Sequence, residues 1–124
     1  MGAKILVVDD SPTIRSTVEW LLTHRGYTVH VEQTGLAALA ALRKFLPDLI
    51  VLDVRLEHFD GVDLCGMIRR IPKFSACPIV MLSGLTSEED KARAFAAGAN
   101  AYVGKPVHVV EFLSTIEAQL KPSA

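Results

Sequence analysis

The amino-acid sequence alternates short apolar runs with longer amphipathic stretches, five times in succession. The apolar runs predict β-strands and occupy residues 5–8, 28–31, 49–52, 79–82 and 101–103. The second run is more polar than the others, which favours a place at the sheet edge. Five strand–helix units in series predict a parallel sheet with helices on both faces, joined by right-handed crossovers. The predicted fold class is a doubly wound α/β sandwich.

The amphipathic stretches carry start and stop signals for helices. Ser11, followed by proline, is a typical helix cap, and Gly26 ends that helix. The second helix, which ends at Pro47, is marked by Leu36, Leu39, Ala40 and Leu42. These signals place one helix after each of the first two strands.

Three further helices are predicted in the second half of the chain. Asp60-Gly61 predicts a turn before a helix over residues 62–68. The capping-box pattern of residues 86–89 opens a helix that includes Phe95 and closes at Gly98. The last helix runs from about His108 to residue 120, and residues 121–124 trail off.

The composition limits the classes of function. A chain of 124 residues, half of them hydrophobic, predicts a single domain (1–124, with a core of about 3–120). Its net charge of -1 gives no reason to expect nucleic acid as a partner. No apolar stretch approaches the roughly 18 residues that span a bilayer. The start of the chain has no signal-peptide layout, and Cys65 and Cys77 are interpreted as reduced thiols, so we expect a cytoplasmic protein.

Groups suited to phosphate chemistry follow four of the predicted strands. They are Asp9 and Asp10, Asp53, Ser83 and Lys105. Parallel strands bring such groups to one carboxyl edge, where open α/β sheets place their sites. Clustered carboxylates repel one another unless a cation intervenes, and Mg²⁺, with Mn²⁺ as an alternative, prefers such oxygen ligands. A carboxylate beside this cation can attack phosphorus while a lysine and a hydroxyl bind the phosphoryl oxygens.

Five segments in this order and spacing resemble the receiver domain of two-component response regulators: residues 5–11, 47–53, 60–61, 78–84 and 98–106. The resemblance implies a flavodoxin-like sheet in the order 2-1-3-4-5. It implies that Asp53 accepts phosphate from a histidine kinase or a histidine phosphotransfer protein. Asp10 would bind the metal directly, Asp9 largely through water, and Arg55 through its backbone carbonyl.

The resemblance also assigns a switch pair and a cis peptide bond. Ser83 would move towards the phosphate, and the ring of Tyr102 would swing into the vacated space. Lys105-Pro106 is similar to the cis peptide that aims the family's lysine. Phosphorylation would then alter the face formed by the fourth helix, fifth strand and fifth helix.

Three features depart from the family pattern or extend it. Arg55 and Glu57 stand where the family often has an apolar residue and a proline. The Arg55 side chain would tune the acyl-phosphate lifetime, or would pair with Glu57 or Asp60 instead. His108 replaces an acidic helix cap. Thr13, Thr17, Trp20 and His24 form a stripe on the first helix, which is either a docking surface for the phosphodonor or packing against the last helix.

We therefore expect a phosphorylation-dependent switch that catalyses only its own phosphorylation and dephosphorylation, and not an enzyme acting on an external substrate. Its downstream protein target is unknown, and a phosphorylation-dependent dimer stays open. The mildly favoured organisation is a stand-alone regulator or one without DNA binding. The alternatives are a phosphate-independent pseudo-receiver and an aspartyl phosphatase of the haloacid-dehalogenase type, which would need an acid where Ser11 stands.

Overall fold

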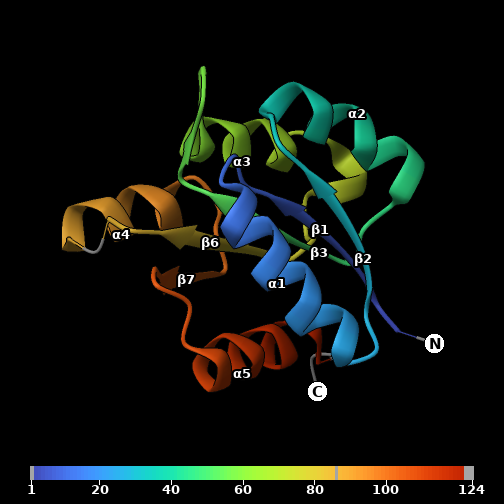
Figure 1. Ribbon diagram of the computed structural model, residues 1–124. Helices are drawn as coiled ribbons and strands as arrows, with labels where there is room; N and C mark the ends of the chain where they lie inside the picture. Colours follow the sequence, from blue (N-terminus) through green and yellow to red (C-terminus); the bar gives the residue numbers. More distant parts are fainter. Residues whose placement is uncertain (1, 86, 122–124) are drawn as a thin grey trace.

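A five-stranded parallel sheet forms the centre of the computed structural model, which describes residues 2–85 and 87–121 (Figure 1). Its strand order is β2-β1-β3-β6-β7. The strands are β1 (Lys4–Val8), β2 (Thr28–Glu32), β3 (Leu49–Asp53), β6 (Ile79–Ser83) and β7 (Ala101–Gly104). Numbered within this sheet, they follow the predicted order 2-1-3-4-5, so the flavodoxin-like fold is confirmed.

Five α-helices cover the two faces of the sheet. They are α1 (Pro12–His24), α2 (Gly35–Phe45), α3 (Gly61–Arg69), α4 (Glu88–Ala96) and α5 (Val109–Leu120), and a short 3-10 helix, η1, spans Pro72–Phe74. Helices α1 and α5 share one core layer with the sheet, while α2, α3 and α4 share the other (Figure 1). None of the helices described has the length and apolar character needed to cross a membrane.

Most helix ends follow the local signals in the sequence. The Ser11 hydroxyl accepts a hydrogen bond from the Ile14 N–H at 3.4 Å, and Gly26 leaves α1 with a φ of 90°. His108 precedes α5 without a capping side-chain bond, as its chemistry predicts. Ser87 caps α4; Thr86, which opened the predicted capping box, lies outside the described residues, as do residues 122–124.

The apolar residues that mark α2 and α4 in the sequence are only partly the ones that face the sheet. Leu36 is 74% exposed and Ala40 is also exposed, whereas α2 buries Ala38, Ala41 and Leu42. In α4, Phe95 is 47% exposed and Ala94 is buried. Runs of leucine and alanine contain more than one stripe at helical spacing, so periodicity does not fix which stripe faces the sheet. The smaller alanines allow a close approach to the strands.

A two-stranded hairpin after β3 was not predicted. Strands β4 (Arg55–Leu56) and β5 (Phe59–Asp60) pair in antiparallel fashion, and His58 turns between them with a φ of 62°. The predicted turn at Asp60-Gly61 is therefore wrong: Asp60 ends β5 and caps α3, which begins at Gly61. Strands of two residues are too short to produce an alternating pattern.

Gly61 packs directly against the end of β3. Its N–H donates to the Val54 carbonyl at 2.7 Å, and a Cβ at this position would lie 1.9 Å from the Asp53 carbonyl oxygen. No side chain fits that gap without moving the backbone. Gly61 therefore lets α3 begin beside the last residue of β3, where the candidate site lies.

A Gly61→Ala substitution should lower the free energy of unfolding by about 2–3 kcal/mol, because the new methyl group overlaps the Asp53 carbonyl. Gly66→Ala, in the same helix, is the matched control, since nothing lies within 4 Å of its added Cβ. That variant should gain up to about 1 kcal/mol from helix propensity. Urea unfolding measures both changes; equal stabilities would contradict the close approach.

Candidate functional site

Three carboxylates meet at the carboxyl edge of the sheet. Asp9 and Asp10 directly follow β1, and Asp53 is the last residue of the neighbouring β3. One oxygen from each lies within 4.8 Å of the other two. Asp9 and Asp53 are 1% and 4% exposed, so two of the three acids are shielded from water. The structure thus brings the three predicted acids together.

Backbone N–H groups hold one oxygen of each acid. The donors are Ser11 to Asp9 at 2.9 Å, Arg55 to Asp53 at 3.1 Å and Glu57 to Asp10 at 2.9 Å. These bonds fix the orientation of the carboxylates and leave Oδ2 of Asp9 and of Asp53 beside Lys105. The hairpin that the sequence did not predict therefore supplies two of the three backbone donors.

Lys105 supplies the positive charge of the site. Its Nζ lies 3.0 Å from Asp9 Oδ2 and 3.2 Å from Asp53 Oδ2, and it donates a hydrogen bond to Asp53. Asp9 Oδ2 is buried and has an ion pair with Lys105 but no partner in hydrogen-bond geometry among the described residues. The predicted cis peptide at Lys105-Pro106 is confirmed. A buried carboxylate oxygen without a hydrogen bond suits a metal cation.

The cluster shifts the protonation equilibria of its members. Burial, reinforced by the charge of Asp9, raises the pKa of Asp53 from 3.8 to about 6, although the Arg55 N–H and Lys105 oppose the shift. Burial would lower the pKa of Lys105, but the Asp9 and Asp53 carboxylates outweigh it and raise that pKa. One ammonium group therefore does not fully balance three acids, and further positive charge would be favourable here.

The predicted switch pair converges on one loop residue, Leu85. The Leu85 N–H donates to Ser83 Oγ at 2.9 Å, and the Tyr102 hydroxyl donates to the Leu85 carbonyl at 2.5 Å. Ser83 is buried and ends β6, the strand that pairs with β3 and places Leu82 opposite Asp53. The two side chains are thus joined through the loop before α4, while their switching motion stays a prediction.

Arg55 lies on the hairpin with its side chain exposed. Neither of the pairings considered for it occurs: Asp60 pairs with Arg93 of α4 at 3.1 Å, and Glu57 contacts His58 at 3.4 Å. Within residues 2–85 and 87–121, Arg55 forms no ion pair. Its guanidinium therefore pairs with neither Glu57 nor Asp60. The effect of Arg55 on the acyl-phosphate lifetime stays a prediction.

The proposed docking stripe of α1 faces solvent. Trp20 is 58% exposed, and Thr13 and Thr17 are exposed as well. The Trp20 ring stacks on His24 with 3.8 Å between the ring centroids. Such exposure disfavours packing against α5, and the docking role itself stays a prediction.

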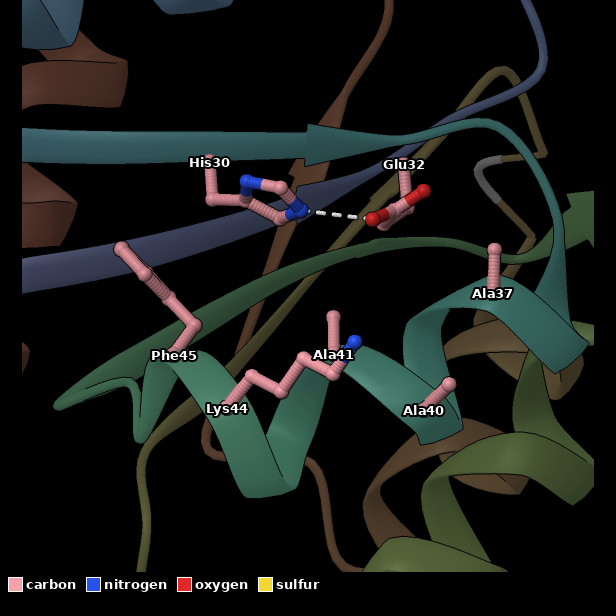
Figure 2. A pocket seen from close by; sticks show the side chains of 7 residues that line it. All are labelled: His30, Glu32, Ala37, Ala40, Ala41, Lys44 and Phe45. Atoms are coloured by element: carbon pink, nitrogen blue, oxygen red, sulfur yellow. Dashed lines mark hydrogen bonds and ion pairs between the residues drawn. The ribbon is translucent and has the colours of Figure 1, made fainter.

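An apolar hollow of about 450 Å³ lies elsewhere, between β2 and α2. Figure 2 shows His30 and Glu32 joined along β2 on one side of it, with Phe45 of α2 on the other side. None of the predicted site residues lines this hollow. It is a surface feature separate from the acidic cluster.

Sequence reasoning missed three supports of the site. The Glu57 N–H is a backbone group, so no residue type signals it. Gly61 was assigned to a turn, whereas it provides a close contact with Asp53. Arg15, whose guanidinium donates to the Asp9 carbonyl at 2.8 Å, was not singled out, because a side chain that binds a backbone carbonyl leaves no pattern of residue types.

Residues 5–117 match the family model described as the response regulator receiver domain. A curated relative, the transcriptional regulatory protein KdpE of Mycobacterium tuberculosis, is 38% identical over 117 residues, covering 94% of this chain and 50% of KdpE. The chain therefore spans about half the length of this relative.

Two solved structures extend the comparison. The chemotaxis response regulator CheY4 of Vibrio cholerae has a TM-score of 0.92 and 34% identity, covering 97% of this chain and 100% of that one. The receiver domain of the sensor histidine kinase PA1611 from Pseudomonas aeruginosa has a TM-score of 0.88 and 28% identity, covering 97% and 98%. That structure has a magnesium ion coordinated in its active site cleft.

Asp53→Asn should stabilise the metal-free protein at pH 7.5. The folded state raises the pKa of Asp53 from 3.8 to about 6. Above pH 6 the ionised carboxylate therefore lowers the free energy of unfolding by about 1–3 kcal/mol. Below pH 3.8 the carboxyl is protonated in both states, so the cost is absent; it grows as the pH rises to about 6.

Urea unfolding at pH 4 and pH 7.5 tests this expectation, with Glu19→Gln as an exposed control. The gap between Asp53→Asn and the wild type should be wide at the higher pH and narrow at the lower one. An Asp53→Asn variant less stable than the wild type at pH 7.5 would contradict the account of repulsion.

Proposed function

Because this chain belongs to the family of response regulator receiver domains, we propose that it is a phosphorylation-dependent switch with Asp53 as its phosphoacceptor. The observation that carries the proposal is the buried cluster of Asp9, Asp10 and Asp53, with Lys105 between two of its members. Burial and the charge of Asp9 disfavour the ionised form of Asp53. Its negative charge is removed from this unfavourable environment when the oxygen forms a bond to an electrophilic phosphorus atom.

The residues of the cluster fit a divalent cation. Three carboxylates supply the hard oxygen ligands that Mg²⁺ prefers, and the buried Asp9 Oδ2 has no hydrogen bond from any residue that the structure describes. Asp10 and Asp53, with the Arg55 carbonyl, would hold the ion directly and Asp9 would hold it largely through water. When bound, Mg²⁺ would supply positive charge next to the transferring phosphoryl oxygens. The magnesium in the receiver of PA1611 supports this proposal.

The residues of this chain then perform the transfer. An Asp53 oxygen forms a bond to phosphorus as the bond between phosphorus and a histidine nitrogen of the donor breaks; that nitrogen keeps the electron pair. Lys105 moves no proton and neutralises charge on the phosphoryl oxygens, and the Ser83 hydroxyl donates to one of them. The donor would be a histidine kinase or a histidine phosphotransfer protein, and the chain would not turn over an external substrate.

The output would be a change in protein contacts. Ser83 exchanges its bond with the Leu85 N–H for one with the phosphoryl group, which frees the loop before α4. The face of α4, β7 and α5 carries exposed apolar side chains that suit a protein target, among them Phe95 and Val110, which are 47% and 80% exposed. The chain spans half the length of KdpE. We therefore propose that the target is either another domain of the same protein or a separate partner protein.

Incubation with acetyl phosphate and Mg²⁺, followed by intact mass measurement, tests the proposal. The wild type should gain the mass of one phosphoryl group, and Asp53→Asn should gain none. The gain should disappear when a chelator removes Mg²⁺. If the wild type takes up no phosphate, the phosphate-independent pseudo-receiver becomes the better account.

Arg55→Met should shorten the acyl-phosphate lifetime by about 3- to 10-fold, the equivalent of about 1 kcal/mol. The reason is that a guanidinium free of other acids can bind the phosphoryl oxygens and hinder the approach of water. Arg70→Met, also exposed but at the end of α3, is the control for lost charge.

The measurement is the decay of phosphorylated protein after the phosphodonor is removed. Phosphorylation itself should still occur and still require Mg²⁺ in Arg55→Met, because the substitution leaves the three carboxylates and the backbone of residue 55 unchanged. Equal acyl-phosphate lifetimes in the wild type and Arg55→Met would contradict the proposed effect of Arg55.

A further inference from the structure

Arg15 is a half-buried arginine that bonds to a backbone carbonyl beside an acidic cluster. Its Nη1 donates to the Asp9 carbonyl oxygen at 2.8 Å. Among residues 2–85 and 87–121, it forms no ion pair with any carboxylate. An arginine near carboxylates commonly forms a bidentate pair with one of them. Here the guanidinium binds the main chain and leaves the acids' oxygens to the cluster.

The carbonyl that Arg15 holds belongs to the peptide between the two adjacent acids. This peptide is planar, so fixing the Asp9 oxygen also fixes the direction in which the chain enters Asp10. The other groups of Asp9 are held as well: its N–H donates to the Glu32 carbonyl at 3.2 Å, and its Oδ1 accepts from Ser11 at 2.9 Å. Arg15 thus completes the set of bonds that orients the Asp9-Asp10 turn.

The position of Arg15 on α1 makes this contact stable. The Arg15 N–H donates to the Ser11 carbonyl at 3.0 Å in the first turn of the helix. Its side chain then reaches back from the helix to the end of β1, across the turn that carries both acids. A rigid helix and a buried strand are joined directly across the metal-binding turn.

We propose that Arg15 is a positioning residue for the divalent-cation site, acting through the peptide between Asp9 and Asp10. This inference rests on the proposed function, because it assumes that these acids hold Mg²⁺. Under this proposal the presence of the three acids is not sufficient for high Mg²⁺ affinity. Arg15 must also hold the Asp9 carbonyl.

Arg15 has two effects on a bound cation, and they have opposite signs. Its positive charge repels Mg²⁺, so a purely electrostatic role predicts tighter Mg²⁺ binding when the charge is removed. Its bond to the Asp9 carbonyl orders the ligands, so a positioning role predicts weaker binding. The direction of the change in affinity therefore separates the two roles.

The experiment compares the full chain with Arg15→Gln, Arg15→Lys and Arg25→Gln. Arg25 follows α1 and pairs with Glu117 on the surface at 3.5 Å, so its variant removes the same charge away from the site. Calorimetric titration with MgCl₂ measures the dissociation constant. Arg15→Gln should raise it about tenfold, as is typical for loss of a group that orients a metal ligand. Arg25→Gln should leave it unchanged.

Two further measurements exclude a general loss of structure. Amide hydrogen exchange of Ser11 without Mg²⁺ should accelerate in Arg15→Gln, while exchange in the core of β3 should not. Arg15→Lys, which keeps the charge and can donate one bond to the Asp9 carbonyl, should recover part of the affinity. If Arg15→Gln does not fold, the affinity and Ser11 exchange of Arg15→Lys decide the question.

Mg²⁺ binding by Arg15→Gln that is equal to or tighter than that of the wild type would overturn the inference. So would unchanged Ser11 exchange in a variant with weakened binding. Failure of the proposed function looks different: the wild type itself would then neither bind MgCl₂ nor take up phosphate from acetyl phosphate. The two failures are therefore distinguishable in one series.

Discussion

Repulsion between the buried carboxylates of Asp9 and Asp53, with Asp10 beside them, is the constraint on which the rest of the structure depends. Parallel strands force these acids together because β1 and β3 are neighbours that end at the same edge. The protein opposes the repulsion with one ammonium group, Lys105, and with one backbone N–H to each acid. This opposition is incomplete, since burial and, after it, the charge of Asp9 still raise the pKa of Asp53 to about 6. The remaining imbalance is what makes the site receptive to a cation and an electrophile.

Two sets of contacts extend from the region of the cluster, one to the loop before helix α4 and one to α4 itself. One runs from Ser83 to the Leu85 N–H, and from the Leu85 carbonyl to Tyr102. The other runs through the hairpin, where Arg55 donates to Asp53 and Asp60 pairs with Arg93 of α4. The hairpin thus links Asp53 to an ion pair on the side of α4, while Ser83 and Tyr102 both hold the loop that precedes α4. Such a double connection suits a domain whose output is a change of surface.

The sequence predicted most of the architecture and the main chemical groups, and the failures have physical causes. The strands themselves followed from apolar runs that lead into Asp9, Asp53 and Ser83, because buried parallel strands are nearly continuous hydrophobic runs. Their order in the sheet followed from the resemblance to receiver domains. The exposure of Leu36 was not predictable, since the alanines and leucines of α2 form several apolar stripes at helical spacing. The hairpin and its N–H donors were missed because backbone groups have no residue signature. Arg15 was missed because its partner is a carbonyl, which no pairing of side chains reveals.

The central claim is that Asp53, rather than either of its two neighbouring acids, forms a bond to phosphorus. Borohydride reduction tests it most directly, because it converts an acyl phosphate on aspartate into homoserine, which peptide mass spectrometry locates. After treatment with acetyl phosphate and Mg²⁺, the account predicts homoserine at position 53 and aspartate at positions 9 and 10. Homoserine at position 9 or 10, or at none of the three, would contradict it.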